Sequence, residues 1–277
     1  MRTTEIFNRL MTAIILASIV VGVIFSFSSA IFDTLILIVA MLCTWEWIRL
    51  ASSHRKRFIE SLLVGAMLAL IIGLIFTPVV LPYLLAAAMI WWASLGIMLI
   101  RHRSVFSSAS WRPHVSHAWI LILPAAAGLG GLYRLGEEGP WYVLTLLLIV
   151  WATDTFAYVV GRSVGSHPLA ASISPAKTVE GAVGGIIGAV LVGFVCLASF
   201  PIPNENTTIF WFCLFLLTSG FGIVGDLAES AYKRFSGVKD TGRLLPGHGG
   251  MLDRMDSVLS ACPVFVAGIF YTLGQGS

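Results

Sequence analysis

Residues 230–256 read SAYKRFSGVKDTGRLLPGHGGMLDRMD, a charged stretch set between two long apolar runs at residues 208–229 and 255–274. An apolar run of roughly 20 residues is long enough to cross the ~30 Å hydrocarbon core of a bilayer as a helix. The sequence therefore predicts two membrane helices joined by a loop. Acidic and basic side chains gather in that loop, at one face of the membrane.

The composition extends this interpretation to the whole chain of 277 residues, of which 57% are hydrophobic and only 11% are charged. These values indicate a polytopic membrane protein and exclude an ordinary soluble domain. The formal net charge of +3 does not indicate nucleic-acid binding, because the basic residues lie in short segments between apolar runs. All four cysteines lie inside apolar runs without CxxC spacing, so we expect packing roles for Cys43, Cys196, Cys213 and Cys262.

The apolar runs predict an all-α fold of about nine transmembrane helices. They lie near residues 9–28, 31–51, 61–78, 82–101, 118–135, 141–162, 178–200, 208–229 and 255–274. The first run is too long for the core of a signal peptide, so we expect it to be retained. We also expect two regions. Residues 1–140 would form about five membrane spans, and residues 141–277 a catalytic region of about four helices with the loop 230–254.

The basic residues predict the orientation of these helices. Of the 17 lysines and arginines, all except Arg134 fall on alternate connections and hence on one side of the membrane. The positive-inside rule makes that side cytoplasmic, so we expect the amino terminus inside and the carboxyl terminus outside. The short connection at residues 28–30 matters here, because a single broken helix in place of the first two spans would reverse every later loop.

Carboxylates in membrane spans are costly, by about 2.5–3.5 kcal/mol at a helix centre, and each needs a partner or a function. A rise of about 1.5 Å per residue places Asp154, Asp226 and Asp256 at similar depths near the cytoplasmic face. Asp226, Glu229 and Lys233 also share one helical face. We therefore expect the three aspartates to converge, although routine ion pairs at a helix end would give the same pattern.

Two further carboxylates are expected to be structural. Asp33 lies at the outer end of its span, away from the inner cluster. Glu46 lies three residues before Arg49, a spacing that predicts an ion pair within one helix.

Asp253 and Asp256 have the i, i+3 spacing that places both carboxylates on one face in the first turns of the ninth helix. Such a pair is often only a solvated helix cap. Here Gly249 and Gly250 precede it, and glycines at a helix start let the backbone approach a phosphate and offer amide donors. The segment therefore favours a phosphate site beside metal-binding carboxylates.

A second anion site is predicted at residues 172–181, SISPAKTVEG. Ser174 suits the N-cap position and Pro175 the first helical position, so free amides would point outward beside Lys177. The alternative is a plain capped helix in which Lys177 only supplies cytoplasmic charge. The GxGxxG string at residues 220–225 lies within an apolar span and indicates helix packing, and no P-loop motif is present.

Taken together, these residues predict divalent-metal carboxylates, phosphate-binding cations and helix-start amides at the cytoplasmic face. A lipid headgroup and a water-soluble polyphosphate could both reach such a site. This combination indicates a lipid-modifying phosphoryl or nucleotidyl transferase.

The same segments carry a family resemblance. SAYKRFSGVKD, continued by PGHGGMLDRMD, resembles the signature of the phosphatidate cytidylyltransferases, also called CDP-diacylglycerol synthases. Residues 154–162 and the SPAKTVEG segment are similar to other motifs of that family. The first 140 residues resemble it only in containing several membrane spans.

The resemblance implies a reaction of CTP with phosphatidic acid that yields CDP-diacylglycerol and pyrophosphate. It implies a bacterial-type cytoplasmic (inner) membrane location, a cytoplasmic active site and a Mg²⁺-dependent two-metal centre whose second metal is left open. The implied metal ligands are Asp226 and Asp256, with Asp253 either a ligand or a neighbour of one. The other implied site residues are Lys233, Arg234, Lys239, Asp154, Ser174, Lys177, Thr178, Glu180, His248, Gly249, Gly250 and Arg254. Whether the protein forms a homodimer is left open.

Two alternatives use the same residues differently. A secondary transporter would use Asp33, Asp154 and Asp226 along an ion pathway, but it predicts a midplane site and paired broken helices. Another CTP-dependent membrane enzyme, such as a lipid kinase, would transfer the γ-phosphate instead.

Overall fold

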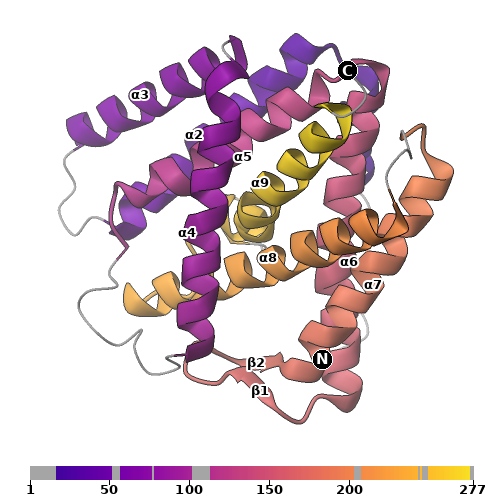
Figure 1. The fold of residues 1–277 in the computed structure, drawn as a ribbon. Coiled ribbons are helices and arrows are strands. Elements are labelled where there is room, and N and C mark those ends of the chain that lie inside the picture. Colours follow the sequence, from indigo (N-terminus) through magenta and orange to yellow (C-terminus); the bar gives the residue numbers. More distant parts are fainter. Residues whose placement is uncertain are drawn as a thin grey trace.

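The computed structural model describes residues 17–51, 57–76, 78–101, 113–202, 207–242, 244 and 249–274. These residues are almost entirely helical (Figure 1). An apolar helix at Ala17–Ser26 is followed by α2 (Ser29–Ala51), α3 (Arg57–Phe76), α4 (Leu81–Arg101), α5 (His117–Tyr133), α6 (Gly139–Val164), α7 (Val179–Ser199), α8 (Thr208–Phe235) and α9 (Leu252–Gly274). Short 3-10 turns occupy Pro78–Val80 and Gly136–Glu138.

Six of the described helices are long and apolar enough to cross a membrane, namely α2, α4, α6 with its preceding turn, α7, α8 and α9. The chain is thus a largely α-helical integral membrane protein, as its composition predicts. The predicted spans at 9–28, 61–78 and 118–135 coincide with apolar helices that are not among these six, so the number nine remains a prediction. Residues 9–16 of the first span lie outside the described residues.

The first two predicted spans are separate helices. The chain leaves the helical conformation at Phe27 and Ser28, and α2 begins at Ser29. The Ser28 carbonyl accepts hydrogen bonds from the amides of Ile31 and Phe32, both at 3.0 Å. Phe27 and Ser28 therefore interrupt the helical conformation between the two segments.

The structure also contains a hairpin that the sequence analysis did not predict. Strands β1 (Pro168–Ala170) and β2 (Ser174–Thr178) pair antiparallel. The prediction that Ser174 caps a helix beginning at Pro175 is therefore wrong, since both residues lie in β2. A proline disfavours helical geometry at the residue before it, which keeps Ser174 extended. The true N-cap of α7 is Thr178, whose Oγ1 accepts a hydrogen bond from the Gly181 amide at 3.1 Å.

Helix α9 lies in the middle of the bundle and packs against α2, α4, α5, α6 and α8 (Figure 1). Its side chains at Ala261, Cys262 and Phe265 are completely buried. The hairpin lies at one end of the bundle, where β2 contacts α6, α7 and α8. Because one buried cluster includes residues from before and after position 140, the first helices support the ones that carry the predicted site.

Close helix contacts depend on glycines at a few positions. A Cβ at Gly185 in α7 would lie 2.7 Å from the Thr153 carbonyl oxygen in α6, and one at Gly225 in α8 would lie 2.5 Å from the Asp256 carbonyl oxygen in α9. By contrast, a Cβ at Gly220 would meet nothing within 4 Å. Gly225 therefore confirms the helix-packing interpretation of the GxGxxG string, whereas Gly220 has no packing role in this structure.

Both carboxylates expected to be structural have bonding partners within the protein. Asp33 forms an ion pair with Arg134, the one basic residue that departs from the charge pattern. The predicted pair between Glu46 and Arg49 is wrong, because the Arg49 guanidinium lies 4.5 Å from the centre of the Trp45 ring and Glu46 bonds to other elements. The carboxylate of Glu46 instead accepts hydrogen bonds from the amides of Met251 and Leu252 at the start of α9.

Candidate active site

Lys177 connects the hairpin to α8 at the candidate site. Its Nζ atom lies 2.5 Å from Asp226 Oδ2, and the two side chains are 27% and 33% exposed. The ammonium also interacts electrostatically with Asp154 of α6. The sequence analysis assigned Lys177 and Asp226 to two separate sites, and the structure joins them into one.

Four carboxylates from three helices, Asp226 among them, converge at this place. Asp256 of α9 interacts electrostatically with Glu229 and Asp226 of α8 and with Asp154 of α6. The predicted convergence of Asp154, Asp226 and Asp256 therefore agrees with the structure. We call these four residues, with Glu229 included, the acidic cluster.

Glu229 is the member that the sequence analysis did not assign to the site. It is 5% exposed, and its Oε1 has no hydrogen-bond partner within the described part of the chain. Its position three residues after Asp226, on the same helical face, was the signal that could have identified it.

Lys233 of α8 lies next to Glu229 of the acidic cluster and links α8 to α9. Its Nζ atom is 2.7 Å from Glu229 Oε2 and 2.7 Å from Asp253 Oδ1, with all three side chains largely buried. A buried charge needs such compensation, since an unpaired one costs several kcal/mol. Lys233 is thus committed to two carboxylates and fixes the relative position of the two helices.

Asp253 holds the turn that precedes α9. Besides Lys233, its carboxylate accepts hydrogen bonds from the amide and hydroxyl of Thr241, both at 3.0 Å, and from the Gly250 amide at 2.7 Å. Gly249 adopts φ +81°, where a Cβ would lie 2.7 Å from Asp253 Oδ2. The glycine turn thus lets the backbone approach a carboxylate of the chain itself.

Glu46 of α2 completes this anchor. Its carboxylate accepts hydrogen bonds from the amides of Met251 at 3.1 Å and Leu252 at 2.8 Å, and from the Thr241 hydroxyl at 3.0 Å. The electropositive start of α9 is thereby neutralised by a residue about 200 positions earlier. The Gly250 amide, which was expected to face a phosphate, donates to Asp253, and the amides of Met251 and Leu252 donate to Glu46.

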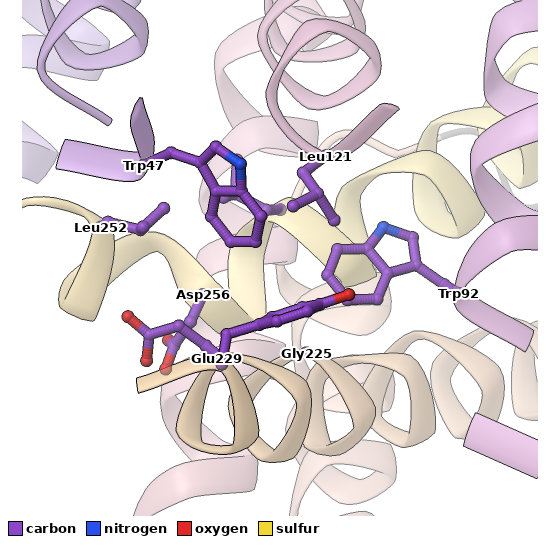
Figure 2. A pocket seen from close by; sticks show the side chains of 9 residues that line it. Trp47, Trp92, Leu121, Gly225, Glu229, Leu252 and Asp256 are labelled. Carbon is purple, nitrogen blue, oxygen red and sulfur yellow. The ribbon is translucent and has the colours of Figure 1, made fainter. Parts of the chain in front are cut away.

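A small cavity lies next to the acidic cluster, as Figure 2 shows. The carboxylates of Glu229 and Asp256 lie at one end of it, and the indoles of Trp47 and Trp92 form part of its wall. The remaining lining residues are Leu121, Gly225, Tyr232, Leu252 and Leu259. Helices α2, α4 and α5 thus place apolar groups against the cluster, which strengthens electrostatic interactions there by lowering the local dielectric constant.

The acidic cluster has the donor chemistry that Mg²⁺ requires. Carboxylate oxygens are the preferred protein ligands of this ion, which is commonly held by one or two of them together with water and substrate phosphates. Within the described residues, no three acidic, histidine or cysteine side chains stand ready in one arrangement around a metal position. A metal held by these carboxylates would therefore need further ligands from water or a bound phosphate.

The remaining predicted residues have varied positions. Arg234 donates from Nε to the Ile173 carbonyl at 3.5 Å, and Arg254 interacts electrostatically with Asp154. Lys239 is exposed on the segment after α8. Glu180 lies at the start of α7, where Oε1 is 2.6 Å from His167 Nδ1 and outside the acidic cluster. His248 lies outside the described residues.

The fold and site together define a class of protein: a helical integral membrane protein with carboxylates and cationic side chains gathered at one end of its bundle. Comparison with known sequences specifies the family. The family model described as "Cytidylyltransferase family" matches residues 7–272, and the chain therefore belongs to that family and is a transferase.

Individual relatives agree with this assignment. A phosphatidate cytidylyltransferase of Haemophilus influenzae is 32% identical over 96% of this chain and 99% of the relative. Another of Pseudomonas aeruginosa is 32% identical over 98% of each chain. One of Staphylococcus saprophyticus is 46% identical over 53% of this chain and 56% of its own length.

Proposed function

We propose that the protein transfers the cytidylyl group of CTP to phosphatidic acid, which yields CDP-diacylglycerol and pyrophosphate in phospholipid biosynthesis. The observation that carries this proposal is the convergence of Asp154, Asp226 and Asp256 with Lys177 in one cluster. The family assignment and the names of the similar proteins support the choice of substrates.

In the proposed reaction an oxygen of the phosphatidate phosphate attacks the α-phosphorus of CTP. A new bond forms between that oxygen and the α-phosphorus. The bond between the α-phosphorus and the oxygen that bridges to the β-phosphate breaks, and pyrophosphate leaves. The attacking oxygen is already an anion at neutral pH, so the step requires neither a protein nucleophile nor a general base. The work of the protein is to position the two phosphates and to stabilise the charge that develops between them.

We assign the metal ions to Asp226 and Asp256, which come from two helices held together at Gly225. When bound, a divalent cation such as Mg²⁺ neutralises phosphate charge and polarises the α-phosphate. The identity of a second ion stays a prediction. Asp253 is already engaged by Lys233, Thr241 and Gly250, so we assign it to positioning the start of α9 instead.

The cationic side chains at the site have separate assignments. Lys177 and Arg254 face the acidic cluster and are proposed to contact the substrate phosphates. Arg234 lies beside the hairpin turn and Lys239 is exposed on the segment after α8, and we propose that both attract the triphosphate. Lys233 is committed to Glu229 and Asp253, and we propose that it positions α8 and α9.

We further propose that the site faces the cytoplasm of a bacterial-type inner membrane, where CTP is available. The distribution of basic residues in the sequence supports this orientation. The Asp33–Arg134 ion pair also supports it, because it neutralises the one basic residue expected on the opposite side.

Purified protein incubated with phosphatidate, Mg²⁺ and CTP labelled at either the α- or the γ-phosphate tests the proposal. Label from the α position should enter the lipid fraction, with an equal amount of pyrophosphate released. Transfer of the γ label would instead identify a lipid kinase, and transfer of neither label would contradict both enzymatic assignments and favour transport.

A further inference from the structure

We propose that Lys177 is a displaceable counterion for Asp226. In the cation-free protein its ammonium occupies the carboxylate, and it leaves when a divalent cation binds, so that it becomes available to a phosphate of the substrate. This inference rests on the proposed function, because it assigns an order of events to the same site: the metal first, then the anion.

The contact between the two residues is close and specific. Nζ of Lys177 lies 2.5 Å from Asp226 Oδ2, and the Nζ atom itself is buried although the rest of its side chain is partly exposed. The same ammonium interacts with Asp154. One lysine therefore serves two carboxylates at the point where the proposed metal would bind.

The two partners differ in how easily they can move. Asp226 lies inside α8, whose neighbouring Gly225 is in close contact with α9. Lys177 lies on β2, at the end of the bundle, and reaches Asp226 with a flexible four-carbon side chain. A change of side-chain rotamers is enough to release Asp226, so no helix has to shift.

Electrostatic repulsion favours replacement of the Lys177 ammonium by a divalent cation over the binding of both to Asp226. A divalent cation carries twice the charge of the ammonium and repels it at short range, so the two cannot occupy Asp226 Oδ2 together. An incoming triphosphate or lipid phosphate then offers Lys177 a new anion. Removing Lys177 should accordingly leave Asp226 open and make metal binding tighter, whereas turnover should become slower.

The test measures Mn²⁺ binding to the full-length, detergent-solubilised protein without substrate, from the paramagnetic resonance signal of free Mn²⁺. Lys177→Gln should bind Mn²⁺ about three- to tenfold more tightly than the unmodified protein, the effect of losing a partly exposed ion pair. The matched control is Arg162→Gln, which removes a positive charge at the end of α6 from a side chain bonded to Tyr158. Its affinity should change by less than about twofold, because solvent screens the more distant charge.

Unchanged or weaker binding in Lys177→Gln would overturn the inference, and so would equal tightening in both variants. If Lys177→Gln does not fold, as judged by gel filtration and circular dichroism, Lys177→Met provides the same measurement. Because the titration needs no turnover, it separates two failures. Unaltered Mn²⁺ affinity together with normal transfer of α-labelled phosphate refutes the inference alone, whereas absence of that transfer refutes the proposed function.

Discussion

Glu46 of α2 accepts a hydrogen bond from the Leu252 amide at the first turn of α9, at a distance of 2.8 Å. Four residues after Leu252, the same helix carries Asp256 of the acidic cluster. The first half of the chain therefore contributes directly to the position of α9. It fixes the rotation and height of the helix that carries a proposed metal ligand.

This relationship predicts the effect of Glu46→Gln. The substitution removes the negative charge that accepts three hydrogen bonds, and bonds of this kind contribute about 1.5–3 kcal/mol each. We expect a lower unfolding temperature in detergent and a loss of activity. The control is Glu137→Gln, an exposed position, which should change neither property. Equal unfolding temperatures for Glu46→Gln and the unmodified protein would contradict an anchoring role.

The close contact of α8 and α9 gives a second prediction. Gly225→Ala places a methyl group 2.5 Å from the Asp256 backbone oxygen, so the two helices must move apart and carry Asp226 and Asp256 with them. Misplacement of reacting groups by a fraction of an ångström is costly, and we expect activity to fall at least about tenfold. Gly220→Ala, with open space at its Cβ, should retain normal activity. The measurement compares the initial rates of the two variants at equal amounts of folded protein, and equal rates would contradict the prediction.

Lys233 gives a prediction about stability. Lys233→Met leaves the largely buried Glu229 and Asp253 without their shared cation, and breaking a buried pair in this way costs about 3–5 kcal/mol. The unfolding temperature should fall strongly. Lys239→Met, at an exposed position, should leave it nearly unchanged. If both variants unfolded at the same temperature, Lys233 would not be a structural counterion.

The Asp33–Arg134 pair lies away from the acidic cluster and should affect stability without affecting catalysis. Arg134→Leu leaves Asp33 uncompensated and should lower the unfolding temperature, whereas the double variant with Asp33→Leu should recover much of the loss. The Michaelis constants should stay unchanged in both variants. Activity that falls further than the amount of folded protein would connect this pair to the reaction.

Sequence patterns predicted the membrane class and the convergence of three aspartates, because both depend on local patterns and on depth along a helix. A run of apolar residues defines a helix, and a fixed rise per residue gives the depth of a carboxylate. Those two quantities were enough to bring Asp154, Asp226 and Asp256 together. The family signature in residues 230–256 added the chemistry of the proposed reaction.

The bonding partners of individual side chains and strands were harder to predict, because they depend on contacts between residues far apart in the chain. Glu46 was assigned to its neighbour Arg49, but the amides of Met251 and Leu252 bind it more directly. Likewise, the pairing of residues 168–170 with 174–178 turned an expected helix start into a strand. That hairpin is what brings Lys177 to Asp226.

The most direct test of the account is the position of a bound metal. Crystals of the protein grown with Mn²⁺ and CTP should show an anomalous scattering peak in contact with the carboxylates of both Asp226 and Asp256. Asp226→Asn and Asp256→Asn should each remove that peak and abolish turnover while the protein still inserts into the membrane. A peak bound elsewhere, or one that survives both substitutions, would contradict the assignment of these two aspartates to the metal site.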